Sequence, residues 1–189
     1  MKILLFIIIG IVLGYIVKMI VNWLKIDNYI MSRKNFFLEA VGALMVTWSA
    51  VNLGIEEAVI FSIIALTLAG ISVIDFHTFE IPLIFIIIGV VATIAGILLK
   101  VIFLSAAFWG IFVGALIPLA IMLILWAITK RQGMGYGDIQ LGIVLGAWLG
   151  PMRMALTLFG ASLLSLLACL LYTSPSPRDA HESRMPSSA

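Results

Sequence analysis

Long apolar runs alternate with short polar segments along almost the whole chain. The hydrocarbon core of a bilayer is about 30 Å thick and takes about 20 helical residues to cross, and most of these runs approach that length. The sixth run is short for a full crossing, and Pro118 is expected to kink the fifth. The runs cover residues 3–24, 36–53, 58–74, 81–99, 101–128, 139–149 and 154 to about 167. This pattern predicts an all-α polytopic membrane protein with about seven transmembrane helices.

The amino-acid composition excludes a soluble domain. Of 189 residues, 63% are hydrophobic and 11% are charged, and the mean hydropathy is +1.25. Soluble domains have about a quarter of their residues charged. The net charge of +2 is spread over scattered residues and builds no basic face, so nucleic acid is excluded as a partner. The single cysteine, Cys169, can form neither a disulfide framework nor a cysteine zinc site within the chain.

Positive charges divide unequally between the two sets of loops, and basic residues accumulate in cytoplasmic loops. One set contains Lys25, Arg33, Lys34, Lys130 and Arg131, and the other contains Lys2, Lys100 and Arg153 with the acidic Glu56 and Glu57. We therefore expect the first set to face the cytoplasm and the N-terminus to lie outside. The same alternation brings Asp75 and Asp138 to the cytoplasmic side.

The end of the chain differs in composition from the rest. Residues 169–189 turn into a Ser- and Pro-rich polar segment without apolar periodicity, which favours disorder. The segment resembles the translated adapter-like tails at the ends of some assembled sequences. We therefore predict a membrane-embedded domain over residues 1–168 and a non-native or disordered tail over 169–189, and expect the authentic protein to continue with a further span.

The most informative polar segment is Gly-Met-Gly-Tyr-Gly-Asp at residues 133–138, directly before the sixth apolar run. Its alternating glycines allow close approach of the backbone, and an aspartate at the edge of a membrane helix is a candidate functional residue. Peptide hydrolysis by aspartates needs two carboxyl groups, one ionised to take a proton from water and one protonated to polarise the carbonyl. Asp75, at the end of the third run, is the best partner for Asp138.

Each of these signals also has a simpler explanation. Asp138 could be an ordinary helix N-cap, Asp75 a solvated carboxylate at a helix end, and the glycines sites of helix packing. The conjunction of all three on one membrane face favours the catalytic interpretation. A helix dipole favours an anion at the helix start and disfavours one at its end. We therefore expect Asp138 to carry the charge and Asp75 the proton.

Other polar residues give weaker signals. Glu39 lies just inside the second apolar run, where we expect it either to pair with a cytoplasmic base such as Arg33 or Lys34 or to take part in the site. His77 is interpreted as a solvated loop histidine. The sequence has no His-Glu-x-x-His, no Ser/His/Asp arrangement and no Walker loop, so we expect no metal ion and no other cofactor.

Up to about residue 168, the chain resembles the type IV prepilin peptidase family of GxGD membrane aspartic proteases. The resemblance is carried by Gly135-Tyr136-Gly137-Asp138, by Asp75 with the following Ile81-Pro82, by Gly10 and Gly14, and by the segment 36–40. It implies that Asp75 and Asp138 are catalytic and that Gly135, Tyr136, Gly137 and Glu39 contact the substrate.

The resemblance implies removal of the basic leader from prepilins or pseudopilins at the cytoplasmic face of the inner (plasma) membrane. Three departures matter. Residues 25–35 lack the paired cysteines of members with a linked N-methyltransferase activity, so peptidase activity alone is expected. Gln140 stands where the family usually has Lys, and the family's last span is missing. The alternatives are a presenilin-like protease, which shares GxGD, and a small transporter or scaffold whose intramembrane carboxylates bind protons or cations.

Overall fold

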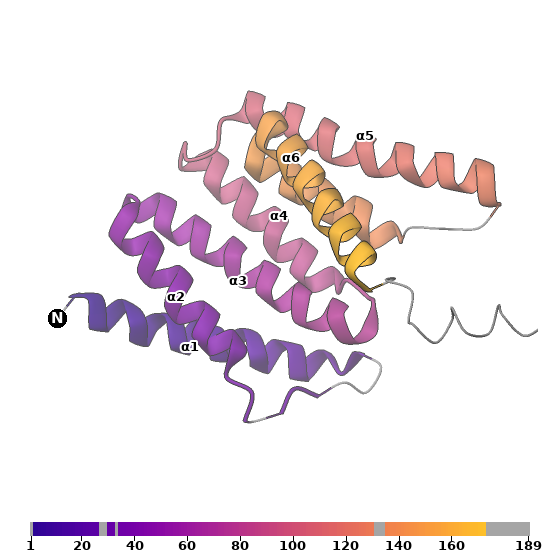
Figure 1. Cartoon of the computed structure of the whole chain (residues 1–189). Coiled ribbons are helices and arrows are strands. Elements are labelled where there is room, and N and C mark those ends of the chain that lie inside the picture. The colour runs from indigo at the N-terminus through magenta and orange to yellow at the C-terminus, as the bar shows by residue number, and fades with distance from the viewer. Residues whose placement is uncertain (1, 27–29, 33, 131–134, 173–189) are drawn as a thin grey trace, which may run out of the picture. The chain divides into compact units, whose positions relative to one another are not determined.

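The computed structural model of the chain describes residues 2–26, 30–32, 34–130 and 135–172. In this part of the chain the regular structure consists of six α-helices (Figure 1). They are α1 (Lys2–Leu24), α2 (Phe37–Asn52), α3 (Ile55–Thr78), α4 (Leu83–Leu98), α5 (Leu104–Thr129) and α6 (Tyr136–Tyr172). The prediction of an all-helical protein is confirmed.

Four of these helices, α1, α3, α5 and α6, are long and apolar enough to cross a membrane. The other two, α2 and α4, are apolar but have 16 residues each. At 1.5 Å per residue they extend about 24 Å, somewhat less than the hydrocarbon thickness of about 30 Å. The chain is therefore a polytopic membrane protein, as its hydropathy predicted.

The ends of α3 differ from the prediction. The helix begins at Ile55, so the acidic pair expected in a turn lies in its first turn. It continues to Thr78, four residues beyond the third apolar run, so the prediction that His77 lies in a loop is wrong. Phe79, the C-cap residue that follows Thr78, has a left-handed backbone (φ 55°) and donates its N–H to the Asp75 carbonyl over 2.9 Å. Hydropathy marks where apolar residues stop, whereas backbone hydrogen bonding decides where the helix stops.

The break expected at residues 150–153 appears as a kink inside α6. Gly150 has φ 75° and ψ 172°, outside the helical region, and Pro151 follows it. The structure divides into two compact units after Met154. The first contains α1 to α5 and the start of α6, and the described part of the second is the rest of α6. Within the segment predicted as a tail, residues 169–172 continue α6, and residues 173–189 lie outside the described residues.

Two helix pairs in the first unit approach so closely that backbone meets backbone. A Cβ added to any of these glycines would overlap backbone atoms of the opposite helix. Small residues permit this kind of packing between membrane helices. They are Gly10 and Gly14 of α1 against Gly42 of α2, and Gly110 and Gly114 of α5 against Gly142 and Gly146 of α6. The helix that carries Asp138 is thereby held directly against α5.

A buried apolar cluster supports the end of α3 and the start of α4. Its buried members include Met31, Ile74 and Phe85. Gly70 leaves room for the Phe85 ring, since a Cβ there would lie 2.8 Å from it. Ile81 and Leu141 pack against the same cluster from the α3–α4 connection and from α6. One apolar cluster therefore underlies the segments that follow Asp75 and Asp138.

Candidate active site

A cleft of about 700 Å³ lies where the end of α3 meets the start of α6. Asp75 and Asp138 both line it, although they are far apart in the sequence. The other lining residues are Phe79, Glu80, Ile81, Gly135, Gly137 and Gln140. Asp75 is exposed and Asp138 is half-buried, so both carboxyl groups are accessible to water. The cleft thus has the two components that carboxylate-catalysed hydrolysis needs: a pair of carboxyl groups and open access.

Gly137 brings the two sides of the cleft together. A Cβ at this position would lie 3.2 Å from Cβ of Ile81 and 3.4 Å from its Cδ1, which is closer than ordinary van der Waals contact. A larger residue would therefore push the α3–α4 connection away from α6. Gly135, in contrast, has room, since its nearest neighbour would be Asp138 Oδ2 at 3.7 Å. The two glycines of the motif have different structural tasks.

Asp138 is the third residue of α6, and its side chain helps to begin that helix. Its Oδ2 accepts a hydrogen bond from the Gly135 N–H over 3.3 Å, and its own N–H donates to the Gly135 carbonyl over 3.2 Å. This is the acceptor half of a capping box, in which the third helical residue satisfies an otherwise unpaired N–H. Asp138 is therefore not the ordinary N-cap that the sequence allowed, because it caps the start of α6 from the third helical position while it lines the cleft.

Asp75 lies in the last turn of α3, at the C-terminal end of its helix dipole, whereas Asp138 lies at the N-terminal end of the α6 dipole. The C-terminal end of a helix disfavours an anion, and the N-terminal end favours one. His77 follows on the same turn, where its Nδ1 lies 2.8 Å from the Val73 carbonyl oxygen. His77 is exposed, as expected, but it belongs to a helix rather than a loop and does not line the cleft.

Glu39 does not line this cleft. It is buried near the start of α2, and its Oε1 accepts a hydrogen bond from Lys18 Nζ of α1 over 2.9 Å. The expected pairing with a cytoplasmic base such as Lys34 is therefore corrected: the partner lies in the first membrane helix. Arg33, the other expected partner, lies outside the described residues. Tyr136, the first residue of α6, is exposed and also does not line the cleft.

Lys18 was not among the candidate residues predicted from the sequence, although its spacing from other small and polar residues of α1 gave a signal. Gly10, Gly14, Lys18 and Asn22 recur at intervals of four and so share one face of α1. Lys18 Nζ also donates to the Asn35 carbonyl over 2.6 Å, and the Asn22 side chain accepts the Met31 N–H over 2.7 Å. This face of α1 therefore anchors the segment that leads into α2.

Gly133 and Met134 of the motif, like Arg131, lie outside the described residues. In the part of the chain that is described, no group of three or more His, Cys, Asp or Glu side chains could hold a metal ion. The cleft's chemical groups are its carboxylates and the Gln140 amide.

Comparison with known protein families matches residues 59–170, more than half of the chain, to the type IV leader peptidase family. The chain belongs to the type IV leader peptidase family. No curated protein and no solved structure matches it. The matched segment includes both cleft aspartates and excludes α1 and α2, so the Lys18–Glu39 pair lies outside it.

Family membership confirms the resemblance drawn from the motifs. This type IV leader peptidase is an aspartic-type endopeptidase with prepilins as its substrates. Its four long apolar helices place it in a bilayer. Asp75 and Asp138 are acidic residues of the matched segment that line one cleft.

Proposed function

We propose that Asp75 and Asp138 are the catalytic pair, and that the enzyme removes the basic leader from type IV prepilins or pseudopilins. The observation that carries the proposal is the cleft that both aspartates line. Their opposite helix positions support a division of roles. The Asp138 carboxylate takes a proton from water, the resulting hydroxide attacks the scissile carbonyl, and protonated Asp75 donates a hydrogen bond to the carbonyl oxygen. The leaving amine then receives a proton from the pair.

The substrate would enter the cleft in an extended form. Gly135 and Gly137 line the cleft, and the open space beside Gly135 leaves room for an extended leader around the scissile bond. We keep Tyr136 and Glu39 as proposed substrate contacts outside the cleft: Tyr136 is exposed beside it, and Glu39 lies at the start of α2. The apolar stem of the prepilin would remain in the bilayer.

The proposed orientation has the N-terminus outside and the cleft at the cytoplasmic face of the inner (plasma) membrane. It rests on the unequal distribution of basic residues between the loops. We also propose seven crossings, with the kink at Gly150 separating the last two, and a peptidase domain over residues 1–168 followed by a non-native tail over 169–189. The lack of cysteine in residues 25–35 supports peptidase activity without N-methylation.

The experiment is co-expression of the full chain with a prepilin, followed by gel analysis of leader removal. Asp75→Asn and Asp138→Asn should each abolish cleavage while the protein stays in the membrane, and Glu56→Gln, a matched loss of one carboxylate at the other end of α3, should cleave normally. Mass spectrometry of the mature pilin should find a free, unmethylated N-terminal amine. Cleavage that survives either aspartate change would rule out the pair.

A further inference from the structure

A second pocket lies at the opposite end of α3 from the catalytic cleft. It has a volume of about 620 Å³, within the range of about 300–1,000 Å³ typical of small-ligand sites. Glu57 lines it from the first turn of α3, and Asp75 lies in the last turn of the same helix. They are eighteen positions apart, which corresponds to about 27 Å along the helix. The pocket is therefore separate from the peptidase chemistry and close to the other membrane surface.

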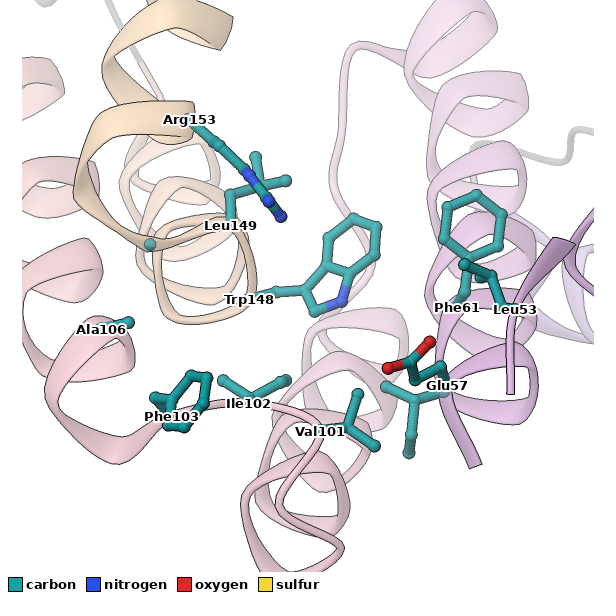
Figure 2. A pocket seen from close by; sticks show the side chains of 12 residues that line it. Leu53, Glu57, Phe61, Val101, Ile102, Phe103, Ala106, Trp148, Leu149 and Arg153 are labelled. Carbon is teal, nitrogen blue, oxygen red and sulfur yellow. The ribbon is translucent and has the colours of Figure 1, made fainter. Parts of the chain in front are cut away.

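Figure 2 shows the pocket and the side chains that face it. The Glu57 carboxylate, the Trp148 indole and the Arg153 guanidinium all point inward, from α3 and from both sides of the kink in α6. Trp148 lies between the two charged groups in this view. Phe61 packs against the indole with ring centroids 6.0 Å apart. A carboxylate, an aromatic pair and a guanidinium therefore line one cavity.

The walls of the pocket are held in place by the backbone. The N–H groups of Val101 and Ile102 both donate to the Gly96 carbonyl, over 2.9 and 3.0 Å, which fixes the connection between α4 and α5. Ile102 is buried over Gly96, where a Cβ would lie 2.7 Å from its Cδ1. On the other wall, the Gly150 backbone is one that is essentially confined to glycine, and it sets the direction of the segment bearing Arg153.

These groups select a ligand that has both charges. A guanidinium binds phosphate oxygens through paired hydrogen bonds. An ammonium group is attracted both by a carboxylate and by the faces of aromatic rings. A simple anion would be repelled by the Glu57 carboxylate, and a simple cation would be repelled by the Arg153 guanidinium. A group with phosphate and ammonium a few bonds apart satisfies both ends of the pocket.

The surroundings of the pocket fit a lipid better than a soluble metabolite. The pocket lies at the end of a membrane-spanning helix, the level at which headgroups and tryptophan side chains are found. Phe103 lines the pocket and is 76% exposed, and Leu104 beside it is 69% exposed. These apolar side chains offer a path for acyl chains that leave the pocket toward the hydrocarbon.

We infer that this pocket binds the headgroup of a zwitterionic phospholipid of the phosphoethanolamine type, with Arg153 on the phosphate and Glu57, Trp148 and Phe61 around the ammonium. The lipid would join α3 to the kinked segment of α6 at the surface opposite the cleft. The site is independent of the proposed catalytic pair and would persist if that assignment failed.

The test uses the full chain, delipidated in an uncharged detergent. Short-chain phosphatidylethanolamine and phosphatidylglycerol with the same acyl chains are titrated, and bound lipid is counted by native mass spectrometry. The wild type should bind the ethanolamine lipid roughly tenfold more tightly, the order expected of an ammonium held by a carboxylate and aromatic rings. Equal affinity for the two lipids would overturn the inference, whatever the variants do.

Variants assign the preference to the pocket. Glu57→Gln should bring the ethanolamine lipid down to the affinity of the glycerol lipid, whereas Glu56→Gln, its neighbour outside the pocket, should keep the preference. Arg153→Gln should weaken the binding of both lipids to the same extent, because both carry a phosphate. If Glu57→Gln does not survive purification, Trp148→Leu tests the aromatic wall of the pocket instead. It should lower the preference for the ethanolamine lipid, and Trp23→Leu, outside the pocket, serves as its control. A preference that is unchanged in the pocket variants would refute the site.

A competition experiment tests whether the pocket recognises the headgroup itself rather than the acyl chains. Soluble phosphoethanolamine should displace the ethanolamine lipid, and soluble glycerol phosphate should do so much less well. Equal displacement by the two would show that the ammonium is not recognised and would overturn the assignment.

Discussion

At the scale of single residues, the geometry of the cleft depends on glycine at position 137. Gly137 has no Cβ, and this lets Ile81 pack against the start of α6 beside the cleft that Asp75 and Asp138 line. Gly137 and Ile81 themselves carry no catalytic chemistry. Their contact sets how far apart the two sides of the cleft lie, and a catalytic carboxylate pair tolerates little displacement.

We predict that Gly137→Ala lowers kcat for leader cleavage roughly tenfold, because a shift of a few tenths of an ångström at the cleft should cost less than the loss of about a hundredfold attached to 1 Å. The double variant Gly137→Ala/Ile81→Gly should recover part of that loss, because the closest contact of the new Cβ is with the Ile81 Cβ, which glycine lacks. Kinetics on purified enzyme with a prepilin substrate, with Ile81→Gly alone as the control, measures both. If the double variant is no better than Gly137→Ala, the glycine contacts substrate directly and does not act through Ile81.

At the scale of elements, the association of α1 with α2 combines a backbone contact and a buried ion pair. Gly10 and Gly14 bring the helices together, and one turn further along the same face Lys18 meets Glu39. The side chains of this pair are only 6% and 9% exposed. Glu39 Oε2 has no hydrogen-bond partner in the part of the chain that the structure describes. The pair is therefore sensitive to the loss of either member.

Lys18→Met should destabilise the protein by about 3–5 kcal/mol, because it leaves a buried carboxylate without its counter-ion. Lys18→Met/Glu39→Met should be clearly more stable than that single variant, since no unpaired charge remains. Unfolding in detergent measures the series, with exposed Lys34→Met as a control expected to match the wild type. A single variant as stable as wild type, or a double variant no better than the single, would contradict this account of the pair.

At the scale of the whole molecule, the question is which membrane face holds the cleft. The two ends of α3 provide the comparison, because Glu56 lies in its first turn and Glu80 just beyond its end, and both are exposed. Such a helix is long enough to cross the hydrocarbon core. The two positions should therefore be accessible from opposite sides.

The proposed orientation predicts the labelling pattern of single cysteines in a Cys169→Ser background. A membrane-impermeant maleimide should label Glu56→Cys in intact cells and Glu80→Cys only after permeabilisation. The physical reason is the excess of basic residues in the loops on the side of Glu80, which favours their retention in the cytoplasm. The reverse pattern would put the catalytic cleft outside and remove the proposed access to cytoplasmic leaders.

Much of this protein could be predicted from local sequence. The apolar runs predicted its helices, because crossing a bilayer requires a length of apolar residues that is visible in one dimension. The motif at Asp138, with Asp75 before Ile81-Pro82, indicated the family, which the comparison confirmed. Helix ends were less predictable, since α3 continues through polar residues to Thr78 where hydropathy had already changed.

Only the tertiary structure decided which faces meet. That Lys18 rather than a loop base pairs with Glu39 depends on the close contact of α1 with α2. That Glu57 and Arg153 share a pocket depends on the backbone of Gly150. Hydropathy is a property of each residue in turn, whereas these pairings follow from the rotation and spacing of helices, which are set by contacts between segments distant in the chain.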